Sequence, residues 1–500
     1  MQTLLFLSWV LLIVLSLWVR VGALEGRSMH ADEAVQGMIF ADLLENGHYA
    51  YNPRHYHGPS LYYLSLPLAR ARGETSAASL DETTLRMLPF LFGLFLAASP
   101  LMLRHELKFP GVLVAAGFLL LSPGLVYYSG YYIQEMLLVA GLGWFTVCSW
   151  RWLEHGRTGW AVATGLAAGL MLSSKENAPL LMLLAWAVLL LGRRLAAGAG
   201  ERMRLRPALL AWAVAAALLV ALPLYSSFGQ NPSGILDAVR SWFVYEAGAG
   251  HEKPWYYYLS ILAGWSRGPL RLGGEAGLAL AGTISLVILL LPGPRHSARR
   301  PGLEFLSIGF LLLVLLSLVS YKTPWLILGV LCPLALSAGC GFSVAWDRWK
   351  RLPARIGILA LLGLCWFGLA REDRWATRIM PEDERNPYAY VHTSWDIPVL
   401  AGRIHRIAGA AGGPEIKVMA EEYWPIPWYL RDLDKVGYWT GIPENPYAPV
   451  MIVGIELAGQ LDSARMQDYQ VEFRGLRPGR LLLVYIRRDL WEAYIGQPAG

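Results

Sequence analysis

The stretch ALLAWAVAAALLVALPLY, residues 208–225, decides the fold class. It contains no charged side chain, and the segment before it, RRLAAGAGERMRLRP (193–207), carries five arginines. An uncharged apolar run of about 18 residues or more is long enough to cross a lipid bilayer as a helix. The same alternation of apolar run and basic connection recurs over the first three quarters of the chain. We therefore expect a polytopic helical membrane protein.

Composition supports this expectation, and the positions of the apolar runs give the number of expected spans. The 500 residues are 55% hydrophobic and only 16% charged, whereas soluble chains are about 25% charged. The net charge of +6 comes largely from the short loops, so no nucleic-acid partner is indicated. We expect about eleven spans, at 3–22, 84–103, 110–126, 134–150, 159–172, 178–192, 208–225, 274–292, 304–320, 326–344 and 356–370.

The charges of the connecting loops orient these spans. Alternate loops are basic, as in 104–109, 151–158, 193–207, 293–303 and 345–355. The short loops on the other side are 127–133, 173–177 and 321–325, and their only basic residues are Lys175 and Lys322. Basic loops lie on the cytoplasmic side of membrane proteins. We therefore expect a cytoplasmic N-terminus, an uncleaved first span and an extracytoplasmic C-terminus.

The pattern changes after residue 370, which predicts two domains. Residues 1–370 form the expected membrane domain, with two long outer loops at 23–83 and 226–273. Residues 371–500 lack a long apolar run and form the expected extracytoplasmic domain. Short β-like runs alternate there with helical patterns, which is typical of a small α/β domain. Its expected strands are Ile416–Ala420, Val450–Gly454 and Leu481–Ile486, and its expected helices lie near 397–410, 422–431 and 457–466.

Two adjacent carboxylates, Asp32 and Glu33, stand in MHADE (29–33) just beyond the first span. Asp32 suits the N-cap of the helix expected at 33–44. Alternatively, one carboxylate is a general base that accepts a proton from an attacking hydroxyl, while the other orients it or binds a cation. Spacing alone leaves both interpretations open.

Further polar residues occupy the same expected side of the membrane. His55 and His57 are two residues apart in an extended segment; they are either metal ligands or interfacial hydrogen-bonding groups. Glu135 stands at the outer end of the fourth span, close to Tyr131, and Lys175 and Glu176 form a polar island between two spans. A charged group at the edge of a span is costly unless it is paired or hydrated, and snorkelling to the surface is the simpler alternative.

The second long outer loop adds His251, Trp255 and Arg267, and YKTPW (321–325) adds Lys322. Arginine binds phosphate through a bidentate fork and lysine as a point charge, although both are also common interfacial anchors. Carboxylates, cations and aromatics on one side suit group transfer from a phosphate-activated membrane lipid. Neither a P-loop nor a dinucleotide-binding motif is present in the sequence.

Several motifs carry a family resemblance. The Asp-Glu pair after span one, the carboxylate after the second outer Tyr-rich loop, and the outer C-terminal domain resemble the GT-C glycosyltransferases, which include protein O-mannosyltransferases and the ArnT-type aminoarabinose transferases. MHADEAVQG, HYHGPSLYY, SSKENAP, YKTPW and EYWPIPWYLR are similar, more narrowly, to a prokaryotic family identified as flippase-activity-associated proteins.

The resemblance implies a polyprenyl-phosphate-linked sugar donor and an inverting single displacement onto an acceptor hydroxyl of a glycan, lipid or protein. By position, Asp32 would be the catalytic base with Glu33 beside it, and Glu135 the second acidic position. A divalent metal serves some members only; His57, Glu135 and His251 are its candidate ligands here. The alternative is a flippase or transport component, or a non-catalytic partner, in lipid-linked glycan export.

Overall fold

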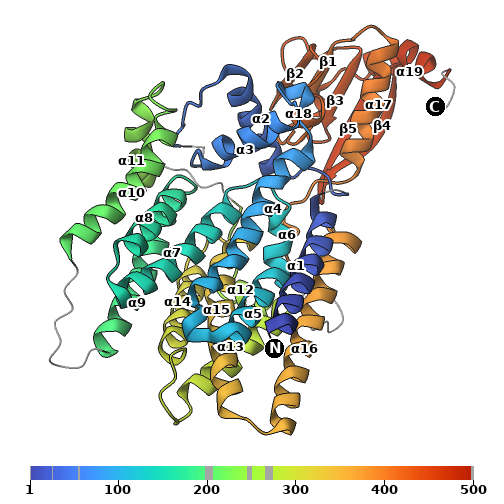
Figure 1. The fold of residues 1–500 in the computed structure, drawn as a ribbon. Coiled ribbons are helices and arrows are strands. Elements are labelled where there is room, and N and C mark those ends of the chain that lie inside the picture. Colours follow the sequence, from blue (N-terminus) through green and yellow to red (C-terminus); the bar gives the residue numbers. More distant parts are fainter. Residues whose placement is uncertain are drawn as a thin grey trace. The chain divides into compact units, whose positions relative to one another are not determined.

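The computed structural model describes residues 2–24, 26–54, 57–196, 206–244, 250–264 and 274–496 (Figure 1). Two of the predicted site residues, His55 and Arg267, lie outside this part of the chain. The chain divides into two compact units, which are described separately. The first comprises residues 1–25, 47–71 and 83–390, and the second comprises residues 26–46, 72–82 and 391–500.

The first unit is helical, and every expected span coincides with a helix. Seven stretches of the described residues are long and apolar enough to cross a membrane, and α8 and α13 are shorter apolar helices. The chain is thus a multi-pass membrane protein. The helices corresponding to the expected spans are α1 (Gln2–Leu24), α4 (Glu82–Ala98), α5 (Arg104–Leu121), α7 (Glu135–His155), α8 (Thr158–Leu172), α9 (Ala178–Ala196), α10 (Pro207–Tyr225), α13 (Ala276–Leu290), α14 (Arg299–Leu318), α15 (Leu328–Arg348) and α16 (Leu352–Arg374).

Shorter helices of the first unit lie between these spans. Between α1 and α4 the first unit contains α3 (Ser60–Ala71). The others are α6 (Pro123–Ser129), α11 (Ser233–Val244) and α12 (Tyr257–Ala263). The second and third expected spans are nearly continuous, with the break at Lys108, whose φ is 54°. Pro110 follows, and proline lacks the N–H that a helix interior needs.

Burial separates central from peripheral helices. In α7 and in the stretch containing α15, 89% of the most apolar part of the helix is buried. The corresponding share is 22% in α9 and 11% in the stretch containing α16. A helix that is apolar all round and buried forms a core, whereas an exposed apolar face meets lipid. Glycines allow close approach within this core: a Cβ at Gly339 of α15 would lie 2.6 Å from the carbonyl oxygen of Gly111 in α5.

The first unit continues beyond the expected boundary at residue 370. Helix α16 ends at Arg374, and one π-helical turn follows at Trp375–Ile379. Tyr388 then anchors the connecting segment, because its hydroxyl donates to Glu275 (3.2 Å) and its carbonyl accepts from Tyr128 (2.7 Å). Apolar runs alone could not reveal this polar attachment.

The second unit contains a five-stranded sheet in the order β2-β1-β3-β5-β4. Strand β1 pairs in parallel with β2 and β3, whereas β5 is antiparallel to β3 and β4. Buried residues of α17 pack with one face of the sheet. The elements are α2 (Ala31–Asn46), α17 (Asp396–Ala410), β1 (Ile416–Met419), α18 (Ile426–Tyr429), β2 (Val436–Trp439), β3 (Val450–Gly454), β4 (Tyr469–Arg477), β5 (Arg480–Arg487) and α19 (Arg488–Ile495).

The α/β class expected for this region is confirmed, and three details differ. Strands β2 and β4 and helix α19 were not anticipated. The helix expected at 422–431 is only one turn, α18, because Pro425 and Pro427 limit it. The helix expected at 457–466 is replaced by two 3₁₀ turns, Ala458–Gln460 and Arg465–Asp468.

Candidate active site

The two adjacent carboxylates lie in the first turn of α2 and have different surroundings. Helix α2 begins at Ala31, so Asp32 is inside the helix and is not its N-cap. Glu33 accepts from the backbone N–H of His30 at 3.1 Å, which is the glutamate half of a capping box. The N-cap interpretation of Asp32 is therefore wrong, because its neighbour performs the capping.

Glu33 is fully buried and paired. Both of its oxygens lie 3.2 Å from Nη2 of Arg27, whose side chain is also buried. A buried charge is tolerated when it is paired and hydrogen-bonded. The side chain of Asp32, by contrast, is 52% exposed; its carboxylate lies 3.8 Å from Nδ1 of His30, and the charge of Arg477 also acts on it. Of the two carboxylates, Asp32 is therefore the one that is open to solvent.

The C-terminal part of the second unit holds this helix start. The hydroxyl of Tyr429, in EYWPIPWYLR, accepts from the backbone N–H of Met29 at 2.7 Å. Ser28 donates to the carbonyl of Thr393 at 2.8 Å. Two motifs about 400 residues apart in sequence therefore form one local structure.

The aromatic motif is itself fixed within the second unit. Trp428 is fully buried, and its indole N–H donates to Glu82 at 3.2 Å. The guanidinium of Arg431 stacks 3.9 Å from the Trp428 ring and donates to the carbonyls of Ala77 and Leu80. Packing and hydrogen bonding within the second unit therefore explain these side chains.

A second histidine lies beside the helix start. The rings of His30 and His392 meet edge to face, with centroids 5.9 Å apart. Burial lowers the pKa of His392 well below its usual value, and the nearby charge of Arg27 lowers it further. His392 is therefore neutral at physiological pH.

In the first unit, two predicted segments form a pair of touching turns, HGPS (57–60) and SSKEN (173–177). The backbone N–H of Gly58 donates to Ser174 (3.1 Å), and that of Ser60 donates to Ser173 (2.9 Å). A Cβ at Gly58 would collide with the Ser173 carbonyl. This close approach explains the glycine and brings the start of α3, the end of α8 and the start of α9 together.

The side chains of these turns continue the contact. Nδ1 of His57 lies 2.9 Å from Oε2 of Glu176, and the hydroxyl of Tyr51 donates to Oε1 at 3.2 Å. Burial alone would raise the pKa of Glu176, but the hydrogen bond and charge of His57 outweigh it, and the net shift is downward. Glu176 is therefore ionised at neutral pH and orients the imidazole.

Lys175 and Glu135 form a neighbouring ion pair, and both side chains are largely buried. Glu135 also occupies the first turn of α7, where a carboxylate interacts favourably with the helix dipole. Tyr131, just before this helix, is buried, and its hydroxyl lies 3.2 Å from that of Tyr127. The pairing explains how a charged residue is kept at the end of this central helix.

Lys322 and His251 belong to another pair of loops in the first unit. The backbone N–H of Lys322 donates to the His251 carbonyl at 2.9 Å, and its buried ammonium group donates to the Val319 carbonyl. Nδ1 of His251 lies 2.7 Å from the hydroxyl of Tyr390. Trp255 is 65% exposed nearby in the chain.

The predicted metal ligands each contact a different partner and do not form a cluster. His57 contacts Glu176, Glu135 pairs with Lys175, and His251 meets Tyr390. No group of three or more His, Cys, Asp or Glu residues that could hold a metal occurs in the described part of the chain. These residues do not fit a metal ion, and no chemical step is derived through one.

Sequence analysis missed the residues that distinguish Asp32 from Glu33. Arg27 and Tyr429 define the environment of the helix start, and Tyr51 completes that of Glu176. Arg27 lies six residues from its partner, so a basic residue just before the acidic pair was an available signal. The contact of Tyr429 with Met29 had no local signal.

Comparison with known proteins identifies the fold. The crystal structure of apo ArnT from Cupriavidus metallidurans matches with a TM-score of 0.69 and 16% identity, over 98% of this chain and 99% of that one. The chain has the fold of the GT-C membrane glycosyltransferases. ArnT bound to undecaprenyl phosphate gives 0.67 and 16%, over 95% and 97% of the two chains.

A second GT-C protein shares the fold more distantly. AglB from Archaeoglobus fulgidus, an oligosaccharyltransferase solved with an inhibitory peptide and a dolichol-phosphate, gives a TM-score of 0.52 at 13% identity, over 98% of this chain and 77% of that one.

Sequence comparison adds one regional match. The model of the family described as dolichyl-phosphate-mannose-protein mannosyltransferase matches residues 61–233, which include Glu135, Lys175 and Glu176. No curated protein sequence matches the chain. The GT-C resemblance is thus confirmed at the level of the fold, and the narrower resemblance to flippase-activity-associated proteins stays a prediction.

Proposed function

We propose that this GT-C protein is a membrane glycosyltransferase that moves a sugar from a polyprenyl-phosphate donor to an acceptor hydroxyl on the extracytoplasmic side. The regional match to a family that uses dolichyl-phosphate-mannose supports the donor class. Two of the structural neighbours were solved with undecaprenyl phosphate and a dolichol-phosphate. The basic loops on the opposite side support the orientation.

The observation that carries the proposal is the difference between Asp32 and Glu33. Asp32 presents an exposed carboxylate in the first turn of α2, and Glu33 in the same turn is buried and paired with Arg27. Asp32 is therefore proposed as the general base and Glu33 as a positioning residue. A positioned base contributes about 10²- to 10⁴-fold to the rate.

The proposed reaction is a single displacement with inversion. The acceptor hydroxyl gives its proton to Asp32 while its oxygen attacks the anomeric carbon of the donor. The bond from that carbon to the phosphate oxygen breaks, and polyprenyl phosphate leaves with both bonding electrons. Attack and departure on opposite faces of the sugar account for the inversion.

The negative charge that develops on the leaving phosphate requires cations. Lys175 is proposed as a phosphate ligand, with Glu135 holding its ammonium group in place. Lys322 and Arg267 are proposed for the same task. The residues proposed to line the substrate site are His55, His57, Tyr131, Glu176 and Trp255.

The proposal is tested with purified protein reconstituted in liposomes. A polyprenyl-phosphate sugar labelled in the sugar is offered, and a nucleotide sugar serves as the control donor. We expect labelled sugar to be transferred from the polyprenyl-phosphate donor and not from the nucleotide sugar. If the donor crosses the bilayer with its sugar-phosphate bond intact, the protein is instead a lipid transporter and the proposed activity is contradicted.

A further inference from the structure

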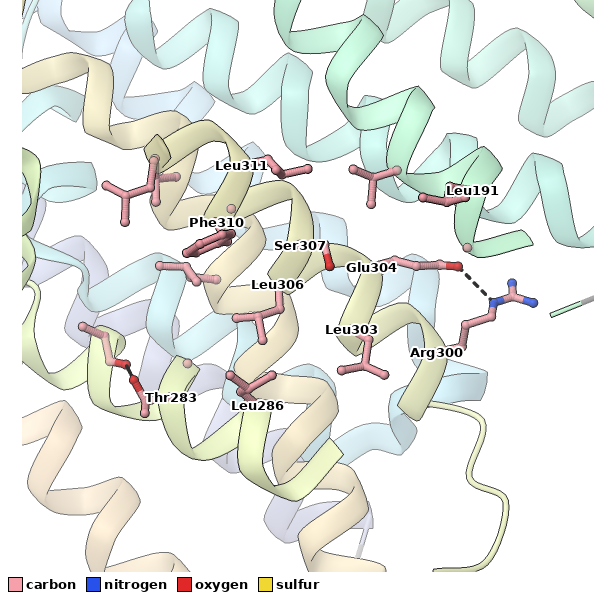
Figure 2. A pocket seen from close by; sticks show the side chains of 18 of the residues that line it. Leu191, Thr283, Leu286, Arg300, Leu303, Glu304, Leu306, Ser307, Phe310 and Leu311 are labelled. Atoms are coloured by element: carbon pink, nitrogen blue, oxygen red, sulfur yellow. Dashed lines mark hydrogen bonds and ion pairs between the residues drawn. The ribbon is translucent and has the colours of Figure 1, made fainter. Parts of the chain in front are cut away.

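A long apolar groove runs along the first unit between α9, α13 and α14 (Figure 2). Its volume is about 950 Å³, at the upper end of ordinary ligand pockets. The walls are mostly aliphatic, with one leucine from α12 and further contacts from α15. The groove has no part in the proposed transfer chemistry. Representative wall residues are Leu191, Leu262, Leu286, Leu303, Phe310 and Leu334.

Of the described residues that line the groove, two are charged, and both stand at the same end of α14. These are Arg300 and Glu304, one helical turn apart, and a dashed line joins them in Figure 2. Farther along α14 the lining is Leu306, Ser307 and Phe310. The groove is therefore amphipathic along its length.

The charged end is part of a network that joins three helices. Glu154 of α7 accepts from Arg193 of α9 (3.0 Å) and from Arg300 of α14. The indole of Trp150 donates to Glu304 at 2.8 Å. A Cβ at Gly192 would collide with Glu304, so glycine lets α9 approach this carboxylate. The network fixes the charged end of the groove as a built structure.

Positive charge exceeds negative charge at this end. The last turn of α9 contributes Arg193 and Arg194, and α14 begins with Arg299 and Arg300. Among the described residues of these two turns and their partners, four arginines stand against two glutamates, Glu154 and Glu304, which leaves a count of +2. A guanidinium has five N–H donors, more than its carboxylate partners here use. Basic pockets between membrane helices are suited to anionic lipid headgroups.

We propose that this groove is a binding site for an anionic glycerophospholipid. The phosphate lies at the arginine-rich end formed by α9 and α14, and one acyl chain follows the leucine-lined walls. Charge complementarity selects the headgroup and the apolar walls accept the chain. The site is separate in role from the proposed donor site, and its orientation follows the basic loops expected on the cytoplasmic side.

The full chain is equilibrated with equimolar phosphatidylglycerol and phosphatidylcholine, and retained lipid is counted by native mass spectrometry. We expect a preference for phosphatidylglycerol on the order of tenfold, as a net charge of +2 implies. The variant R193Q/R194Q removes this net charge, while Glu154 keeps Arg300 as a partner. The preference should fall to less than about twofold. The matched control K350Q/R351Q changes an exposed basic pair at the start of α16 and should retain it.

A second variant tests the groove without touching charge. Ser307→Trp fills the groove and should reduce retention of phosphatidylglycerol at least about threefold, whereas Leu318→Trp, on the same helix but outside the lining, should not. No preference in the unmodified protein, or an unchanged preference in R193Q/R194Q or Ser307→Trp, overturns the proposal. Displacement of the retained phospholipid by equimolar polyprenyl phosphate would assign the groove to the donor chain and also overturn it.

Discussion

The start of α2 and the pair of turns at 57–60 and 173–177 both contain several charged side chains. They differ in whether a charged side chain is left exposed to solvent. At α2, Glu33 is buried with Arg27 and Asp32 remains exposed. At the turns, Lys175 pairs with Glu135, and Glu176 with His57. One region presents a proton acceptor and the other presents charges that are already matched. Among these clustered charges, the exposed carboxylate is therefore a better candidate for chemistry than the buried, paired groups.

The largest expected effect is the loss of the open carboxylate. Asp32→Asn removes the proton acceptor, and turnover should fall about 10²- to 10⁴-fold. The unfolding temperature should stay within experimental error, because the side chain is exposed. Asp42→Asn, on the exposed face of the same helix, is the control and should keep its turnover. Activity in Asp32→Asn comparable to the control would contradict the assignment.

Breaking a matched pair at the turns should instead destabilise the protein. Lys175→Met leaves the carboxylate of Glu135 buried and unpaired, which costs about 3–5 kcal/mol. The free energy of unfolding measures this directly. The double variant Lys175→Met/Glu135→Leu should recover most of the stability but not the donor affinity. Recovery of both would reduce Lys175 to a structural residue.

Substitution of the buried carboxylate of α2, Glu33, should lower stability, as breaking a pair at the turns does. Substitution of its neighbour Asp32 should not. Glu33→Gln loses charge-assisted hydrogen bonds to Arg27, worth about 1.5–3 kcal/mol. Denaturant unfolding should show this loss. Asp489→Asn, which breaks an exposed pair with Arg487, should cost less than about 1 kcal/mol. Equal costs for the two variants would contradict the buried role of Glu33.

The contact between Tyr429 and Met29 should matter modestly. Tyr429→Phe removes the acceptor for a buried backbone N–H, at a cost of about 1 kcal/mol. Turnover should fall less than tenfold, because Asp32 itself stays in place. Tyr423→Phe, in the same aromatic motif, is the control for both measurements. A loss as large as that of Asp32→Asn would mean that Tyr429 acts on the substrate.

The smallest expected effect is the contribution of Glu176 to the pH dependence of the unfolding free energy. Because the pKa of Glu176 is lowered in the folded protein, its stabilisation is fully present above its unfolded pKa, which is near 4.5, and is lost as pH falls through the folded value. The difference in unfolding free energy between the wild type and Glu176→Gln, at most about 1 kcal/mol, should therefore vanish in acid. A difference that persists unchanged below pH 3 would contradict the paired state of Glu176.

The membrane helices could be predicted because their signal is local. Apolar length alone located each span, and alternate basic loops gave an expected orientation. The α/β class of the second unit was also predictable, although β4 was missed. In its sequence, YQVEFRGLR, polar residues interrupt the apolar ones, and it is an edge strand. Edge strands lack the continuous apolar run of a central strand such as β3.

The candidate site was predictable only in part, for a physical reason. The residue types at 32–33, 135 and 175–176 were visible in sequence, but which of them were buried was not. Burial of Glu33 accompanies contacts of the preceding residues with Thr393 and Tyr429, which are more than 360 residues away in the chain. Long-range packing of this kind decides which carboxylate is free, and no local pattern encodes it.

The most direct test of the central claim is a single-turnover assay that compares Asp32→Asn with Glu33→Gln per folded molecule. Sugar transferred from the polyprenyl-phosphate donor is measured within the time of one wild-type turnover. We expect less than about 1% of the wild-type product for Asp32→Asn and most of it for the molecules of Glu33→Gln that remain folded. The opposite order, with Asp32→Asn active and folded Glu33→Gln inactive, would contradict the account.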